Sequence, residues 1–252
     1  MNVVVFAKWV PLGTPELGED RRLARGRDDG LDAGDEFGIE LAIQLAERDG
    51  GEVTVITMGP EGAAAAIQRA LAMGAHRGIL VTDDALAGAD ALATARVLAA
   101  AASRQPFDLL VGGVESADGY TGTVPATVAE FLDLPSVTFA RRVDVEGGEL
   151  RAERQTPSGY DEVACALPAL VTLTAGATEP RYPSVKGIMQ AKSKPLDRVT
   201  LDDLGLSASD VAPTQSVAAV EPAPEQAGGE IIEAGDDAIA RIADLLAEAK
   251  VI

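Results

Sequence analysis

The residues best suited to chemistry form a glycine-rich segment near the middle of the chain. Residues 112–123 read Gly-Gly-Val-Glu-Ser-Ala-Asp-Gly-Tyr-Thr-Gly-Thr and lead from an apolar run into an amphipathic one. Backbone N–H groups at such a strand-to-helix turn can bind a phosphate, with help from the hydroxyls of Thr121 and Thr123. The segment has neither the G-x-G-x-x-G fingerprint nor the Walker A pattern. An ordinary turn is therefore an equally good interpretation of its spacing.

Independent catalysis is not predicted from this sequence. His76 is the only histidine and Cys165 the only cysteine. With no second ligand near either of them, we expect neither a metal site nor a Cys–His pair. No nucleophile, base and orienting group can be assembled, so the prediction is a binding protein without catalytic residues.

Strand and helix patterns alternate four times from the N-terminus. Apolar runs typical of buried strands occupy 2–10, 52–58, 78–81 and 107–111, and helical patterns follow them at 35–47, 62–73, 89–103 and 121–132. This alternation predicts an α/β fold with a doubly wound, mostly parallel sheet. Ligands of such sheets bind beyond the carboxyl ends of the strands, where the strand order reverses. We therefore expect the site between the first and fourth strands, at residues 7–11 and 112–121.

The second half of the chain follows a different pattern. Short strand patterns at 136–145, 149–155, 161–167 and 170–174 should extend the sheet antiparallel at one edge. After Lys194 the chain is rich in Pro, Ala, Ser and Glu, and residues 236–250 have an apolar helical face. We expect one α/β domain over 1–194, then an extended linker and a C-terminal arm over 195–252. A short helix beyond a linker is marginal alone, so this one should pack on a partner subunit.

The composition excludes two classes of partner. Asp and Glu number 40 against 21 Lys and Arg, a net charge of −19, and aromatic residues make up only 4%. Such a chain repels a nucleic-acid backbone and offers few stacking surfaces. No apolar run approaches the ~20 residues of a membrane-spanning helix. The single cysteine and the lack of an export signal favour a cytoplasmic protein, and the acidity favours a halophile over an acidic mesophile.

Five separated segments together resemble the beta subunit of electron transfer flavoproteins. The most specific is 179–192, Glu-Pro-Arg-Tyr-Pro-Ser-Val-Lys-Gly-Ile-Met-Gln-Ala-Lys, which is locally basic in an acidic chain. The others occur in the family's order at 5–11, 35–36, 57–60 and 70–78. The resemblance covers most of residues 1–200 and implies an adenine-nucleotide-binding, Rossmann-like domain.

The resemblance also implies partners and cofactors. In this family an alpha subunit holds most of a redox FAD, and the beta subunit buries a structural AMP. The heterodimer carries electrons from acyl-CoA and other flavin dehydrogenases to ETF-quinone oxidoreductase and the respiratory chain. In a subset of the family, a second FAD replaces the AMP and electron pairs from NADH are split. A stand-alone nucleotide-binding protein is the alternative from another class.

Residue matching to the family implies two sets of contacts. The nucleotide contacts are Phe6, Asp32, Asp35, Met58, Gly113, Asp118, Gly119, Tyr120, Thr121, Gly122, Thr123 and Val124. The segment 179–194 docks on dehydrogenases, and the residues implied in docking are Arg181, Tyr182, Pro183, Val185 and Ile188. Val185 takes the position of an aliphatic residue that enters a hydrophobic pocket of the dehydrogenase. The alternative is that Val185 packs within its own subunit.

Overall fold

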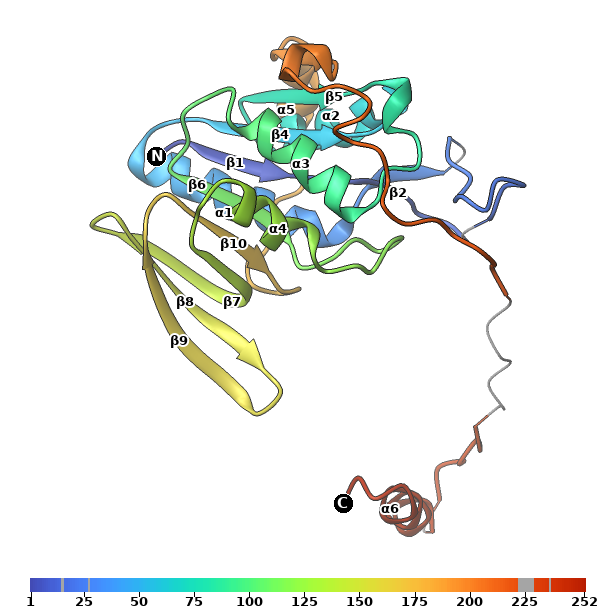
Figure 1. The fold of residues 1–252 in the computed structure, drawn as a ribbon. Coiled ribbons are helices and arrows are strands. Elements are labelled where there is room, and N and C mark those ends of the chain that lie inside the picture. Colours follow the sequence, from blue (N-terminus) through green and yellow to red (C-terminus); the bar gives the residue numbers. More distant parts are fainter. Residues whose placement is uncertain (15, 27, 222–228, 236) are drawn as a thin grey trace. The chain divides into compact units, whose positions relative to one another are not determined.

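The computed structural model describes residues 1–14, 16–26, 28–221, 229–235 and 237–252. The chain divides into two compact units, Met1–Val217 and Ala218–Ile252. Among the described residues, the first unit holds a nine-stranded sheet in the order β11-β5-β4-β1-β6-β10-β7-β8-β9 (Figure 1). A separate antiparallel pair, β2 (Trp9–Pro11) and β3 (Asp29–Leu31), precedes the first helix.

The parallel half of the sheet confirms the doubly wound prediction. Its strands are β1 (Val3–Phe6), β4 (Val53–Met58), β5 (Arg77–Val81) and β6 (Leu109–Gly113). The helices that connect or follow them are α1 (Ala33–Asp49), α2 (Ala64–Met73), α3 (Ala91–Ala102) and α4 (Val124–Phe131). Short 3-10 turns precede α2 and α3, at Glu61–Ala63 and Asp84–Leu86. Strand β1 pairs in parallel with β4 on one side and β6 on the other, so the strand order reverses between the first and fourth predicted strands.

The helices cover both faces of the sheet and form two cores. Helices α1 and α2 pack on one face, around Ile39, Ile67 and Leu71. Helices α3 and α4 pack on the other face, around Leu98 and Leu110, and lie in front of the sheet in Figure 1. Each of these large aliphatic side chains contributes about 1.5–3 kcal/mol on burial. Aliphatic packing therefore replaces the aromatic residues that the sequence lacks.

The antiparallel extension is confirmed for three strands and wrong for the fourth. Strands β7 (Ser136–Glu146), β8 (Glu149–Thr156) and β9 (Gly159–Ala166) form an antiparallel meander. Strand β10 (Ala169–Leu173) instead returns between β6 and β7 and is parallel to both. All five of its residues are buried. A strand that is apolar on both faces belongs inside the sheet, where helices cover both sides.

The segment expected to be an extended linker begins with structure that the sequence did not predict. Strand β11 (Leu196–Val199) pairs in parallel with β5 at the edge of the sheet, and the 3-10 turn Asp202–Leu204 follows it. Asp197 and Arg198 are exposed while Val199 is buried. Half-buried edge strands of this kind carry little apolar signal, so the sequence pattern does not reveal β11.

The C-terminal unit contains one amphipathic helix. Helix α6 (Ala238–Glu248) corresponds to the predicted helix 236–250, of which Asp236 lies outside the described residues. Ile239 is 81% exposed and Ile242 is 46% exposed, so the other described residues of this unit do not cover the apolar face. Packing of this face on a partner subunit stays a prediction.

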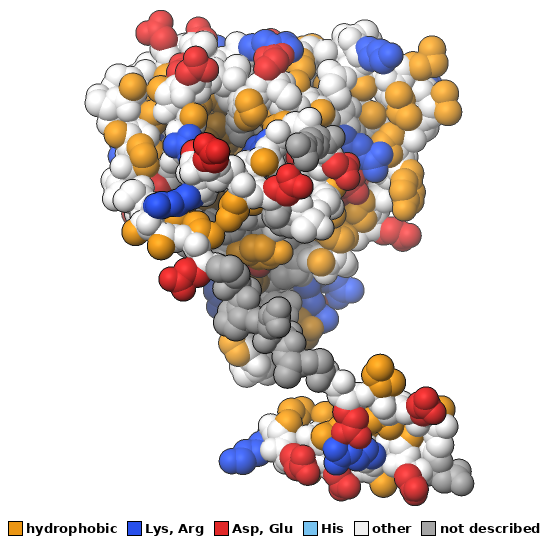
Figure 2. Space-filling model, turned by 90° about the vertical axis from the view of Figure 1, so that its right-hand side faces the viewer, with side chains coloured by type: hydrophobic (Ala, Val, Ile, Leu, Met, Phe, Trp, Pro, Cys, Tyr) orange, Lys and Arg blue, Asp and Glu red, His pale blue; other side chains and the backbone are white. Residues whose placement is uncertain are grey.

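On the face that Figure 2 shows, the basic side chains are not gathered into one patch. There, acidic and basic side chains of the Met1–Val217 unit lie among one another and among apolar ones. Across the described ranges, no helix is both long enough and apolar enough to cross a bilayer.

Candidate binding site at the strand-order reversal

The predicted ligand contacts come together at the carboxyl ends of β1, β4 and β6. Phe6, Met58 and Gly113 end these three neighbouring parallel strands. The first turn of α1 closes this edge: a Cβ on Gly113 would lie 2.7 Å from Oδ1 of Asp35. The close approach of backbone and carboxylate explains why a glycine stands at position 113.

Two buried carboxylates at the start of α1 tie the surrounding loops together. Asp32 is the N-cap residue of α1, and its Oδ2 accepts a hydrogen bond of 2.7 Å from the amide of Ala117. Oδ2 of Asp35 accepts a bond of the same length from the amide of Lys8. Burial, and then the charge of Asp32, raise the pKa of Asp35 to about 7 against the opposing bonds from the Lys8 and Gly113 amides. Both side chains therefore position the loops through hydrogen bonds within the chain.

Two cations converge on Asp118 in the glycine-rich loop. Lys8 Nζ lies 2.6 Å from Oδ1 of Asp118 and 3.0 Å from Oγ of Ser116. The guanidinium of Arg25 contacts the other oxygen of Asp118 and donates to the carbonyl of Trp9 at 2.7 Å. Burial opposes ionisation of Asp118, but the bonds from Lys8 and Arg25 outweigh it and lower its pKa. The two cations together carry one charge more than the Asp118 carboxylate that they share, and Asp32, Asp35 and Glu115 are the acidic residues nearby.

The sequence patterns do not single out these two cations. Lys8 lies within the predicted site at residues 7–11 and in one of the resembling segments, but it is not among the contacts that residue matching implies. Arg25 lies in a polar stretch outside the predicted strands and helices, and 93 residues separate it from Asp118. The family-like segment 5–11 contains Lys8 and could have indicated it, whereas no local pattern shows that Arg25 reaches the loop.

The remainder of the loop is open to solvent. Gly119, Tyr120, Thr121 and Thr123 are exposed, and Tyr120 and Gly122 have positive φ angles of 48° and 61°. Thr123 is the N-cap of α4, and its side chain makes no capping hydrogen bond. Helix α4 begins at Val124, the last predicted contact. Thr123 thus lies at the N-terminus of α4, and Thr121 precedes it by two residues in the same loop as Asp118, which both cations contact. Hydroxyl and N–H groups at a helix N-terminus suit a phosphate.

A hollow of about 750 Å³ adjoins the loop beyond the ends of β6 and β10 and beside β7. Its lining includes Gly34, Val114 and Glu115 from the site, Phe139 from β7 and Leu173 at the end of β10. Phe139 is 45% exposed. The hollow is of a size that holds a large organic group.

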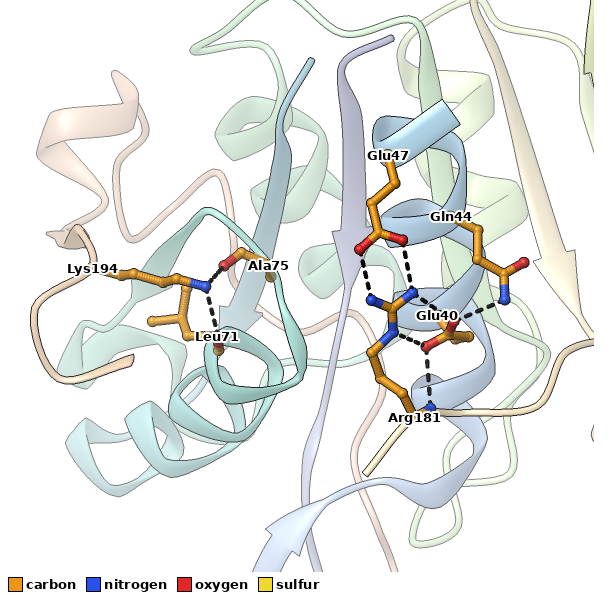
Figure 3. A network of polar contacts seen from close by, with 7 residues as sticks. All are labelled: Glu40, Gln44, Glu47, Leu71, Ala75, Arg181 and Lys194. Carbon is orange, nitrogen blue, oxygen red and sulfur yellow. Dashed lines mark hydrogen bonds and ion pairs between the residues drawn. The ribbon is translucent and has the colours of Figure 1, made fainter. Parts of the chain in front are cut away.

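The segment 179–194 forms a second feature, held at both ends by polar contacts (Figure 3). Arg181 donates to Glu40 at 2.8 Å and 3.0 Å and to Glu47 at 2.7 Å and 3.0 Å, both on α1. Burial opposes ionisation of Glu40, but the bonds from Arg181 outweigh it and lower its pKa. At the other end, Lys194 Nζ donates to the carbonyls of Leu71 and Ala75 at 2.8 Å and 2.6 Å. Both contacts anchor the segment on helices α1 and α2.

Between these anchors lies helix α5 (Val185–Ala191), which packs closely on α2. A Cβ on Gly187 would lie 2.4 Å from the carbonyl oxygen of Ala72, so only glycine permits this approach. An apolar row faces solvent: Tyr182 is 90% exposed, Val185 78%, Ile188 51% and Met189 71%. We call these four residues the exposed row.

The structure separates the residues expected to dock. Tyr182, Val185 and Ile188 are exposed, which disagrees with the alternative that Val185 packs within its own subunit. Arg181, by contrast, is engaged with α1 and holds the segment in place. Met189 was missed, although its spacing of four residues from Val185 places both on one helical face.

The fold and these two features define a doubly wound α/β protein with a polar edge at the strand-order reversal and a separate surface segment that carries an exposed apolar row. Residues 21–204 match the family model described as the electron transfer flavoprotein domain. The chain is 39% identical to the electron transfer flavoprotein subunit beta of Thermoanaerobacterium thermosaccharolyticum, over 96% of this chain and 98% of that one. It is 35% identical to the protein of that name from Mycobacterium tuberculosis, over 100% and 99%. A subunit of the caffeyl-CoA reductase–Etf complex of Acetobacterium woodii is 35% identical over 92% of both chains. The chain belongs to the electron transfer flavoprotein family, among its beta subunits.

Proposed function

We propose that this chain pairs with an alpha subunit in an electron carrier that serves dehydrogenases such as acyl-CoA dehydrogenases. The electrons then pass through ETF-quinone oxidoreductase towards the respiratory chain, and the carrier is cytoplasmic. A flavin shared with the alpha subunit supplies the redox chemistry, while this chain supplies the scaffold and the docking segment. The observation that carries the proposal is the exposed row on a segment anchored at both ends.

The anchors bear directly on docking. Because Arg181 and Lys194 fix the ends of the segment, the exposed row loses little conformational freedom when a partner binds. Burial of Val185 alone contributes about 1.5–3 kcal/mol. A contact of this size suits a transient complex, as a shuttle between enzymes requires.

The residues at the strand-order reversal fit an adenine nucleotide. Lys8 and Arg25 offer positive charge, and Thr121 and Thr123 offer hydroxyls at the start of α4. We assign the phosphate to this group, and the adenosine to the backbone near Phe6 and Met58 with Asp32 and Asp35 holding the loops. Gly113, Asp118, Gly119, Tyr120, Gly122 and Val124 complete the proposed site. The nucleotide is AMP with a structural role, and the adjoining hollow near Phe139 helps to hold the flavin.

A second candidate is a carrier that holds its own FAD in place of AMP and uses NADH. The similarity to the caffeyl-CoA reductase–Etf complex subunit favours including it. The two candidates differ in what the denatured heterodimer should release: one AMP and one FAD for the first candidate, and two FAD without AMP for the second.

The test is co-expression of this chain with its alpha subunit. The purified heterodimer should release one AMP and one FAD on denaturation, and an acyl-CoA dehydrogenase with its substrate should reduce the flavin. Val185→Ala should raise the half-saturating concentration of the heterodimer about tenfold and leave the maximal rate unchanged. A heterodimer without adenine nucleotide, or one that no acyl-CoA dehydrogenase reduces, would refute the proposal.

A further inference from the structure

Helices α2 and α5 enclose a groove next to the exposed row. It has a volume of about 570 Å³. Its apolar lining is Ala72 on α2 together with Pro183, Ile188 and Ala191 from the docking segment. The groove is therefore built by the same segment that displays the row, and Ile188 belongs to both.

The polar side of the groove is basic. Gln68, Arg69 and Lys192 complete the lining, which includes no carboxylate. Arg69 is paired with Glu36 at 3.0 Å. Lys192 is exposed and has no ion-pair partner within the described part of the chain.

Lys186, on the first turn of α5, is a second lysine of the same kind as Lys192. Its side chain is exposed, and the described residues offer it no ion-pair partner. Two uncompensated lysines on one short segment are notable where acidic residues outnumber basic ones by 40 to 21. Charge complementarity therefore points to an occupant that carries carboxylates.

The exposed row is too small to form a docking surface by itself. Specific interfaces bury about 800 Å² per partner, which corresponds to roughly 20 residues on each side. Four side chains, three of them on a helix of 7 residues, fall well short of that area. The groove adjoins the row through Ile188 and adds apolar surface beside it.

We propose that the groove between α2 and α5 is the second half of the docking surface. It receives from the dehydrogenase a segment that carries an apolar side chain with a carboxylate beside it. The apolar side chain lies on Ala72, Ile188 and Ala191, and the carboxylate pairs with Lys192. This inference rests on the proposed function. In it, the exposed row inserts into the dehydrogenase, and the groove receives a segment of the dehydrogenase.

The test measures reduction of the co-expressed heterodimer by an acyl-CoA dehydrogenase that reduces the unaltered protein. Gln68→Trp fills the groove from its rim, and Lys192→Glu reverses its charge. Each should raise the half-saturating heterodimer concentration about five- to tenfold, with a maximal rate within about twofold. Arg104→Glu is the matched control, because this exposed arginine follows α3 on the opposite face of the sheet. It should behave as the unaltered protein does.

The remaining outcomes separate the two proposals. If Val185→Ala raises the half-saturating concentration and both groove variants leave it unchanged, the groove inference is overturned while the proposed function stands. If only the groove variants raise it, docking uses the groove and the role of Val185 is refuted. If none of the three has an effect, both docking assignments fail.

A groove variant that loses flavin or nucleotide has a folding defect. In that case the milder substitution Lys192→Gln tests the groove inference. The half-saturating concentration of the unaltered protein should rise with ionic strength, because salt screens the proposed pair. Lys192→Gln should weaken that dependence. An unchanged dependence on salt overturns the inference.

Discussion

The ion pair between Arg181 and Glu40 should make the unfolding free energy depend on pH. The Glu40 side chain is 4% exposed, and Arg181 and Gln44 donate to it. In Arg181→Leu that carboxylate loses three hydrogen bonds from Arg181, including one from its backbone amide if the segment moves. Breaking a fully buried pair costs about 3–5 kcal/mol. Because Arg181 is 34% exposed, water partly replaces it, and we expect a loss of about 2 kcal/mol near pH 7.5.

The sign of the pH effect follows from the pKa of Glu40. In the native protein that pKa is lowered, so the pair contributes stability above the unfolded value near 4.3, and this stability is lost as the pH falls through the folded pKa. In Arg181→Leu burial is opposed only by the hydrogen bonds from Gln44 and from the backbone amide at position 181, so the pKa of Glu40 rises and protonation relieves the cost. The difference in unfolding free energy between the two proteins should therefore shrink as the pH falls from about 7.5 towards 4.5.

Urea denaturation at several pH values measures this difference. Removing both partners, in Arg181→Leu/Glu40→Leu, should restore much of the lost stability, since no unpaired charge is left buried. Arg142→Leu is the control: its pair with Glu153 is exposed, with 77% of the arginine side chain accessible, and its loss should change stability by at most about 0.5 kcal/mol. A loss for Arg181→Leu that is the same at every pH would refute the reasoning.

Three further predictions concern the binding edge. Lys8→Met should weaken AMP binding about tenfold, because one of the two cations on Asp118 is lost; titration calorimetry on nucleotide-stripped heterodimer measures this, and unchanged affinity would contradict the assignment. Gly113→Ala should lower the unfolding free energy by about 1–3 kcal/mol in urea titrations, because its Cβ would meet Asp35; equal stability would show that the carboxylate can move. Burial raises the pKa of Asp35 to about 7, so the stability of the native protein should fall as the pH rises from about 4 through 7. Asp35→Asn should flatten that decline, and an identical pH profile for both proteins would speak against a raised pKa.

Much of the fold could be predicted from the sequence because burial leaves a local signal. Strands β1, β4 and β6 are apolar on both faces, as strands covered by helices must be. The order of strands and helices then located the reversal between β1 and β6, and with it the loop that contains Asp118. Strand β10 has the same apolar pattern, but that pattern does not indicate which strands β10 pairs with.

The sequence by itself determined the α/β class, the edge of the sheet where a ligand can bind and the segment that carries the exposed row. Only the tertiary structure decided what the charged side chains do. Arg25 reaches Asp118 across 93 residues, and Arg181 reaches Glu40 across 141. Periodicity reports whether a residue lies on a buried face, and it holds no information about a partner on a distant element. Ion pairs of this kind form only where the topology brings the two elements together.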